Sequence, residues 1–71
     1  MEIKRYKTEQ EAVNNAKALS LTHGDFSVIE SPHREDPDAG RFVVEEGDGG
    51  FVRSWERHVA VFHKGKKRRN A

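Results

Sequence analysis

A run of positive charge near the C-terminus carries the clearest chemistry in this sequence. Five cations fall within residues 64–69, namely Lys64, Lys66, Lys67, Arg68 and Arg69. Such a run binds phosphate backbones by releasing their condensed counterions, so its affinity depends on salt and carries no sequence preference. The same composition also suits a solubilising tail without a partner. The sequence therefore predicts either contact with a polyanion, with nucleic acid as the leading candidate, or a plain solvated end.

An aromatic residue between two arginines forms a second candidate site. Arg53, Trp55 and Arg57 would share one face of a strand, because alternate side chains of a strand point the same way. A ring that stacks a base and two guanidiniums that hold phosphates suit a single-stranded nucleic-acid platform. In the alternative interpretation Trp55, the only tryptophan, belongs to the core and its arginine neighbours extend along the surface. Both interpretations stay open at this point.

The acidic residues are concentrated in the middle of the chain. Residues 26–52 carry seven acids and two bases, whereas residues 53–71 carry seven bases and one acid, although the overall charge is only +1. Separated charge of this kind can orient a charged partner, or the acidic segment can lie over the basic end. The candidate contacts for a protein partner lie in the polar segment 31–40 and are Glu35, Asp36 and Asp38.

The other polar residues do not form a pattern typical of catalysis or metal binding. Cysteine is absent, which excludes disulfides and thiolate chemistry. His58 and His63 are an odd number of residues apart and would point to opposite faces of a strand. Ser31, His33 and Asp36 contain the atoms of a catalytic triad, but a single polar loop cannot hold them in relay geometry. We therefore expect a protein that is not an enzyme and has no cofactor and no metal.

One helix is the clearest of the elements that would position these groups. Thr8 to Glu11 form a capping box, in which the Thr8 hydroxyl accepts from the amide of Glu11. Apolar residues then recur at helical spacing, namely Ala12, Val13, Ala16 and Leu19. Gly24 is suited to end the helix. The pattern predicts a helix over residues 8–22 that covers one face of a sheet.

The remaining apolar segments favour strands. Residues 26–30 and 41–46 are short and rich in β-branched and aromatic side chains, and residues 1–7 offer a further edge strand. The stretch 51–62 has the apolar spacing of a helix, but its composition favours two strands divided by a bend near residues 56–57. An exposed sheet edge would also permit a homodimer.

The predicted architecture is an α+β domain with a basic tail. One N-terminal helix would pack on a small antiparallel sheet of three to five strands within residues 1–63, followed by a flexible, disordered tail over residues 64–71. A chain of 71 residues with 34% hydrophobic residues has a thin core. Its longest apolar run has four residues, and no secretory segment follows Met1. We therefore expect a soluble, cytoplasmic protein without a membrane partner.

A helix, three strands and the run Lys64-Gly65-Lys66-Lys67 resemble in outline the double-stranded RNA-binding domain. That family continues into a second helix, which its lysines open and from which they contact phosphates across the major groove. This sequence differs from the family in ending where the second helix would begin and in having an acidic loop after Ser31. We therefore carry no residue role over. The size and plan also resemble small accessory or inhibitor proteins of phages and plasmids, which implies a protein partner contacted through the sheet face or the 31–40 loop.

Overall fold

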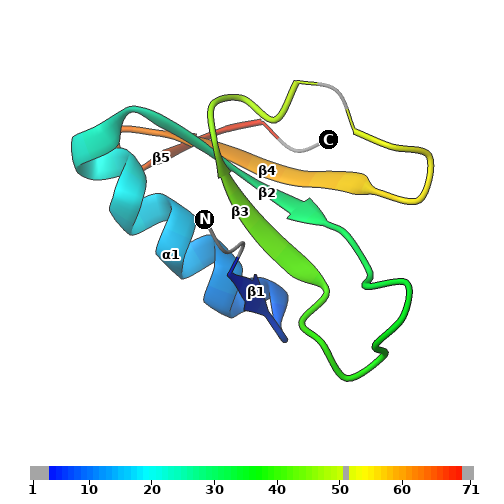
Figure 1. Cartoon of the computed structure of the whole chain (residues 1–71). Coiled ribbons are helices and arrows are strands. Elements are labelled where there is room, and N and C mark those ends of the chain that lie inside the picture. The colour runs from blue at the N-terminus through cyan, green and yellow to red at the C-terminus, as the bar shows by residue number, and fades with distance from the viewer. Residues whose placement is uncertain (1–3, 51, 70–71) are drawn as a thin grey trace.

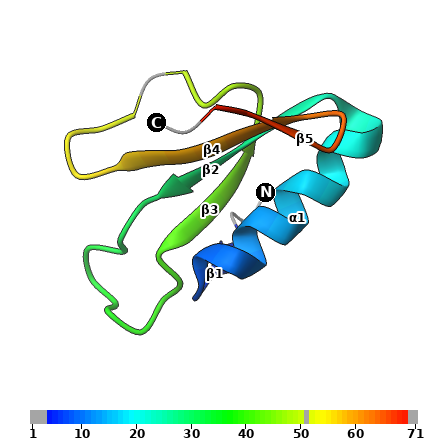
Figure 2. The same cartoon turned by 180° about the vertical axis from the view of Figure 1, so that it is seen from behind.

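One helix lies across one face of a five-stranded antiparallel sheet in the computed structural model of the chain (Figure 1). The structure describes residues 4–50 and 52–69. The elements in chain order are β1 (Arg5–Tyr6), α1 (Glu9–His23), β2 (Asp25–Glu30), β3 (Phe42–Glu46), β4 (Arg57–His63) and β5 (Lys66–Arg69). The strand order is β1-β3-β2-β4-β5, so that β1 and β5 form the two edges of the sheet (Figures 1 and 2). The predicted α+β fold is confirmed.

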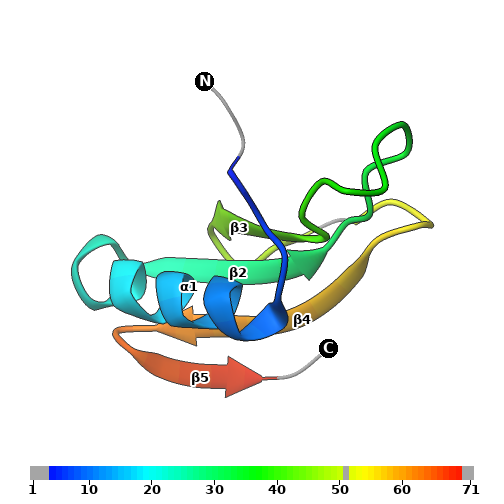
Figure 3. The same cartoon turned by 90° about the horizontal axis from the view of Figure 1, so that it is seen from below.

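Helix α1 begins at the predicted capping box and packs through small residues. The amide of Glu11 donates to Oγ1 of Thr8 at 3.2 Å, and the Thr8 hydroxyl donates to the Glu11 carboxylate at 3.0 Å. Ala12, Ala16 and Ser20 are buried at intervals of four residues and therefore form one stripe of the helix. Figure 3 shows α1 lying along the sheet. No helix in the described ranges is long and apolar enough to cross a membrane.

The two faces of the sheet are covered in different ways. On the face toward α1, the buried core residues of the strands include Phe26, Val28, Ala60 and Phe62. Side chains that alternate with these are buried on the opposite face, namely Ser27, Ile29 and Val61. Both β3 and β4 are antiparallel to β2 and therefore run in the same direction, so the connection between them must bring the chain back across β2. Its described parts are residues 47–50 and 52–56. This connection supplies the cover on the second face.

Residues 52–56 form no strand, so β4 begins only at Arg57. A methyl group placed on Gly49 would lie 2.8 Å from Nε2 of His58, so the connection runs directly against that ring. It ends in a turn in which the amide of Glu56 donates to the carbonyl of Arg53 at 2.9 Å. The strand predicted over residues 51–55 is therefore wrong for residues 52–55, because this part of the chain is used for the crossing, and residue 51 lies outside the described ranges. The strand favoured beyond the bend is confirmed as β4.

A tight hairpin joins β4 to β5 where the sequence predicts disorder. Lys64 and Gly65 have φ angles of 49° and 80°, and positive φ at both central residues is typical of a two-residue type I′ turn. The amide of Gly65 also donates to Oγ of Ser20 at 2.8 Å, which anchors the turn to the end of α1. Residues 66–69 pair with β4 as an antiparallel strand, and residues 70–71 lie outside the described ranges.

Candidate functional site

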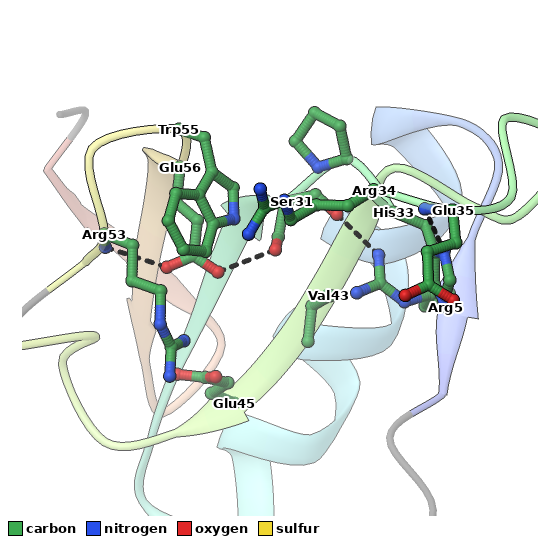
Figure 4. A pocket seen from close by; sticks show the side chains of 11 residues that line it. Arg5, Ser31, His33, Arg34, Glu35, Val43, Glu45, Arg53, Trp55 and Glu56 are labelled. Atoms are coloured by element: carbon green, nitrogen blue, oxygen red, sulfur yellow. Dashed lines mark hydrogen bonds between the residues drawn. The ribbon is translucent and has the colours of Figure 1, made fainter.

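A pocket of about 370 Å³ opens between two loops on the face of the sheet opposite α1 (Figure 4). One wall is the segment 31–35, the other is the turn 53–56, and Val43 and Glu45 of β3 lie between them. Arg5 of β1 also lines the pocket. The walls come from parts of the chain about twenty residues apart, so only the folded sheet brings them together.

Trp55 lies at this pocket with two guanidiniums beside its ring. Its side chain is 47% exposed, so the interpretation of Trp55 as a core residue is wrong. The guanidinium carbon of Arg34 is 5.2 Å from the ring centroid, and that of Arg53 is 5.7 Å away. Both distances fall within the range of attractive cation–π contacts. The site therefore combines an accessible aromatic ring with two positive charges.

Glu56 ties the two walls of the pocket together. Its Oε2 accepts a hydrogen bond from Oγ of Ser31 at 2.6 Å, and its Oε1 accepts one from the amide of Arg53 at 2.9 Å (Figure 4). The Ser31 hydroxyl and then the Arg53 amide lower the pKa of Glu56 below its ordinary value, because both stabilise the carboxylate. The charged form of Glu56 therefore holds the turn 53–56 against the segment that carries Arg34.

Arg5 and Gly40 fix the base of the loop that carries Arg34. The Arg5 guanidinium donates to the carbonyls of Ser31 and Gly40, and the amide of Ser31 donates to the carbonyl of Arg41 at 2.6 Å. A Cβ atom on Gly40 would lie about 2.5 Å from backbone atoms of Tyr6, so only glycine fits here. Arg5 thus closes the loop and is engaged with backbone carbonyls.

The structure brings together two of the three residues predicted for an aromatic platform. Arg53 and Trp55 lie side by side, but through a turn and not through strand alternation. Arg57 instead forms an ion pair with Glu30 at 2.8 Å, and Arg41 contacts the same carboxylate at 3.1 Å. Arg34 takes the place expected for Arg57. Sequence reasoning missed it because its contact with Trp55 depends on the path of two loops.

The predicted cations of the C-terminal run lie along the edge of the sheet. Lys64, Lys66, Lys67 and Arg68 are all exposed, while the side chain of Arg69 lies outside the described part. Lys67 pairs with Phe62, which packs toward α1, whereas Lys66 pairs with His63. Arg68 approaches Asp25 at 3.6 Å, and the same carboxylate contacts the His63 ring. Positive charge is therefore offered on both sides of β5.

The acidic loop 31–40 is ordered by hydrogen bonds between its own residues, and it lies away from this basic edge. Nδ1 of His33 accepts from the amides of Glu35 and Asp36 at 3.2 and 2.9 Å. Oδ1 of Asp36 accepts from the amide of Asp38 at 3.0 Å. All three acids are exposed, and three views place their loop at the opposite end of the sheet from the turn before β5 (Figures 1, 2 and 3). The acidic loop therefore does not cover the basic end.

Two further sources of information, possible metal ligands and similarity to known proteins, do not indicate a function. Within residues 4–50 and 52–69, no group of three or more His, Cys, Asp or Glu side chains is placed to hold a metal ion. Lys64, Lys66 and Lys67, whose run resembles that of the double-stranded RNA-binding domain, lie in a turn and a strand and not at the start of a helix as in that family. Comparisons with protein-family models, curated proteins and solved structures found no match. Charge and geometry are the remaining basis for a function.

Proposed function

We propose that this protein is a small, non-enzymatic binding module that contacts nucleic acid through β5 and the turn before it. The observation that carries this proposal is the row of exposed cations on an edge strand, formed by Lys64, Lys66, Lys67 and Arg68. Only Arg68 of these four forms an ion pair with a described residue. The other three charges are therefore available to a polyanion.

The arrangement of these charges suits a flexible contact with a phosphate backbone. Successive side chains of a strand point to opposite faces, so Lys66 and Lys67 lie on opposite sides of β5. Counterions are released wherever a cation reaches a phosphate, so both sides of the strand can contribute to binding. Long lysine side chains can adjust to small differences in direction, so β5 can follow a backbone without a fixed register. This geometry supports binding that depends on charge and not on base sequence.

The same lysines also have a structural explanation that makes a different prediction. Lysine on an edge strand prevents pairing with the edge of another sheet, because two such edges would bring like charges together. On that explanation β5 is protected from aggregation and has no affinity for phosphate. Nucleic-acid binding at moderate salt therefore separates the two explanations.

An alternative function is a protein–protein contact through the 31–40 loop. The support for it is three exposed acids, Glu35, Asp36 and Asp38. Their loop is held by the His33 ring, which accepts from two loop amides, and by the Arg5 guanidinium, which donates to the carbonyl of Gly40. An accessory or inhibitor protein would present these acids to a basic partner. Such a contact would be lost on Asp36→Asn and Asp38→Asn substitution and would survive changes in β5.

Fluorescence anisotropy with labelled single- and double-stranded DNA and RNA tests the proposal. We expect binding that weakens roughly 20- to 40-fold between about 50 and about 200 mM salt, because three phosphate contacts release about that many counterions. The Asp36→Asn and Asp38→Asn double variant should bind as well as the original chain or better. Absence of binding to all four probes at low salt would contradict the proposal and leave the protein-partner alternative.

A further inference from the structure

We propose that the pocket beside Trp55 receives an unpaired base, so that the nucleic acid bound by this protein is single-stranded. The pocket is the space between residues 31–35 and the turn 53–56, with Val43 of β3 inside it. This inference rests on the nucleic-acid binding proposed above. It assigns the kind of strand and the position of one base, which charge on β5 alone does not do.

The first support is an accessible ring at a pocket of suitable size. Trp55 is one of the few large apolar side chains with an exposed surface, whereas the aromatic residues Phe26 and Phe62 are buried. A volume of about 370 Å³ falls in the range of small-ligand pockets, roughly 300–1,000 Å³. Base–aromatic stacking tolerates every base because each has a flat π surface. A stacked base would also cover apolar surface that water now contacts.

The second support is the pair of guanidiniums on the ring. No described carboxylate lies within ion-pair distance of Arg34 or Arg53, in contrast to Arg41 and Arg57, which share Glu30. Glu35, Glu45 and Glu56 also line the pocket, but none of them lies within ion-pair distance of these two guanidiniums, so both can contact phosphates on either side of a stacked base. A guanidinium plane can also stack on a base itself. Figure 4 shows the Arg34 guanidinium beside the Trp55 ring, and the Arg53 side chain extending from the same turn as Trp55 toward Glu45.

The third support is that the turn carrying Trp55 is ordered before any ligand arrives. Glu56 accepts from Ser31 on one wall and from the Arg53 amide on the other, and the Glu56 amide donates back to the Arg53 carbonyl at 2.9 Å. The backbone on both sides of Trp55 is therefore fixed by hydrogen bonds. Less conformational freedom is lost when a ligand binds to a site that is already ordered.

The fourth support is that the pocket and part of β5 share one face of the sheet. Val43 and Glu45, which line the pocket, alternate with Phe42 and Val44, which pack toward α1. Lys66 pairs with His63, and the His63 ring contacts Asp25 on the face of the sheet opposite α1, where the pocket also lies. A strand held by phosphates at β5 would reach Trp55 by running along the length of the sheet, over the connection that covers this face. A duplex cannot place a base there, because its bases are paired and stacked.

The test uses the fluorescence of Trp55, which is unambiguous because the chain has one tryptophan. The full chain is titrated with a single-stranded DNA of about ten nucleotides, an abasic strand of the same length, and a duplex. We expect quenching by the base-bearing strand alone and about tenfold weaker binding of the abasic strand. Trp55→Ala should bind the base-bearing strand about tenfold more weakly and the duplex unchanged, both measured by anisotropy.

Trp55→Phe keeps a stacking ring and should retain most of the affinity, and unchanged thermal unfolding of both variants shows that the fold is kept. Equal binding of base-bearing and abasic strands without a change in Trp55 emission would overturn the pocket assignment and leave β5 binding intact. Absence of binding to every probe at low salt would instead overturn the proposed function, and the pocket assignment with it.

Discussion

The basic edge at β5 and the Trp55 pocket both offer positive charge, but they are assembled differently. The cations of β5 are consecutive in the chain and need only one hairpin turn to form a row. The guanidiniums at Trp55 come from two loops and meet only because Ser31 contacts Glu56 and Arg5 holds the loop base. The first region depends on local sequence, whereas the second depends on the whole fold.

Because of this difference, we expect β5 to determine how strongly nucleic acid binds and the Trp55 pocket to determine which kind of strand is preferred. A row of exposed lysines attracts any polyanion and tolerates small changes in geometry, because its interaction is long-ranged. Stacking acts only at contact distance, so a shift of either loop removes it. We therefore expect changes in β5 to alter the strength and the salt dependence of binding. Changes in the loops should alter which kind of strand binds best.

The largest effect is expected when the charge of β5 is removed. Substituting Lys64, Lys66 and Lys67 by Gln removes three phosphate contacts, so affinity at about 50 mM salt should fall roughly 100-fold and the salt slope by about 2 to 3. Single strands and duplexes should be affected alike, as measured by anisotropy over a range of salt. A matched control substitutes Lys4, Lys7 and Lys17, which lie outside the C-terminal run. If the control loses as much affinity, net charge and not β5 is responsible.

The next effect breaks the pocket and spares the basic edge. Gly40→Ala places a methyl group against the Tyr6 backbone, which cannot move aside cheaply, so we expect a loss of about 1–3 kcal/mol in the free energy of unfolding. The loop base should shift, and Trp55 emission should become insensitive to a single strand while binding of a duplex persists. Chemical denaturation measures the loss of stability, and Trp55 fluorescence measures the response to a single strand. Asp38→Ala in the same loop is the control, and an equal loss of stability there would contradict the role of the close contact.

A smaller effect is expected from the bridge between the pocket walls. Ser31→Ala removes the hydrogen bond to Glu56 and should cost about 1–2 kcal/mol at neutral pH. Because folding lowers the pKa of Glu56, its carboxylate stabilises the fold above the unfolded value of 4.5, and this contribution is lost as the pH falls through the lower folded value. The stability difference between Ser31→Ala and the original chain should therefore shrink once the pH is well below 4.5. Denaturation curves that show the same difference at both pH values would contradict this assignment.

Local patterns account for the parts of the fold that the sequence predicts correctly. The capping box places the start of α1, and the β-branched runs place β2, β3 and most of β4. The pairing of Thr8 with Glu11 involves residues three apart, so no distant contact is needed to infer it. By contrast, the path from β3 to β4 follows from strand order, which no local pattern carries. The misassigned strand at 52–55 results from that missing information.

The two candidate sites also differ in how far local sequence patterns predict them. The cations of β5 were visible in the sequence, but the strand was not, because Lys64 stands where a type I′ turn favours Asn, Asp or Gly. The sequence predicts the pairing of Arg53 with Trp55, because the two residues are close together in the chain. It does not predict Arg34, since Arg34 reaches Trp55 only after the loop has closed on Arg5. The pairing of Arg57 with Glu30 likewise follows from strand register.

The smallest effect is expected at the turn that makes β5 a strand. Gly65→Ala puts a side chain at φ 80° and within 2.6 Å of the flexible Leu21 side chain, so we expect a loss of about 1 kcal/mol. Gly47→Ala is the matched control, because its φ of 98° is similar but no atom lies within 4 Å of the added methyl group. Faster amide exchange in β5 for Gly65→Ala alone would show that the strand depends on this turn. Nucleic-acid affinity should change less than twofold, because a frayed row of lysines still attracts phosphate. If affinity falls as far as it does on removal of the three lysine charges, the ordered strand and not the charge run alone is what nucleic acid requires.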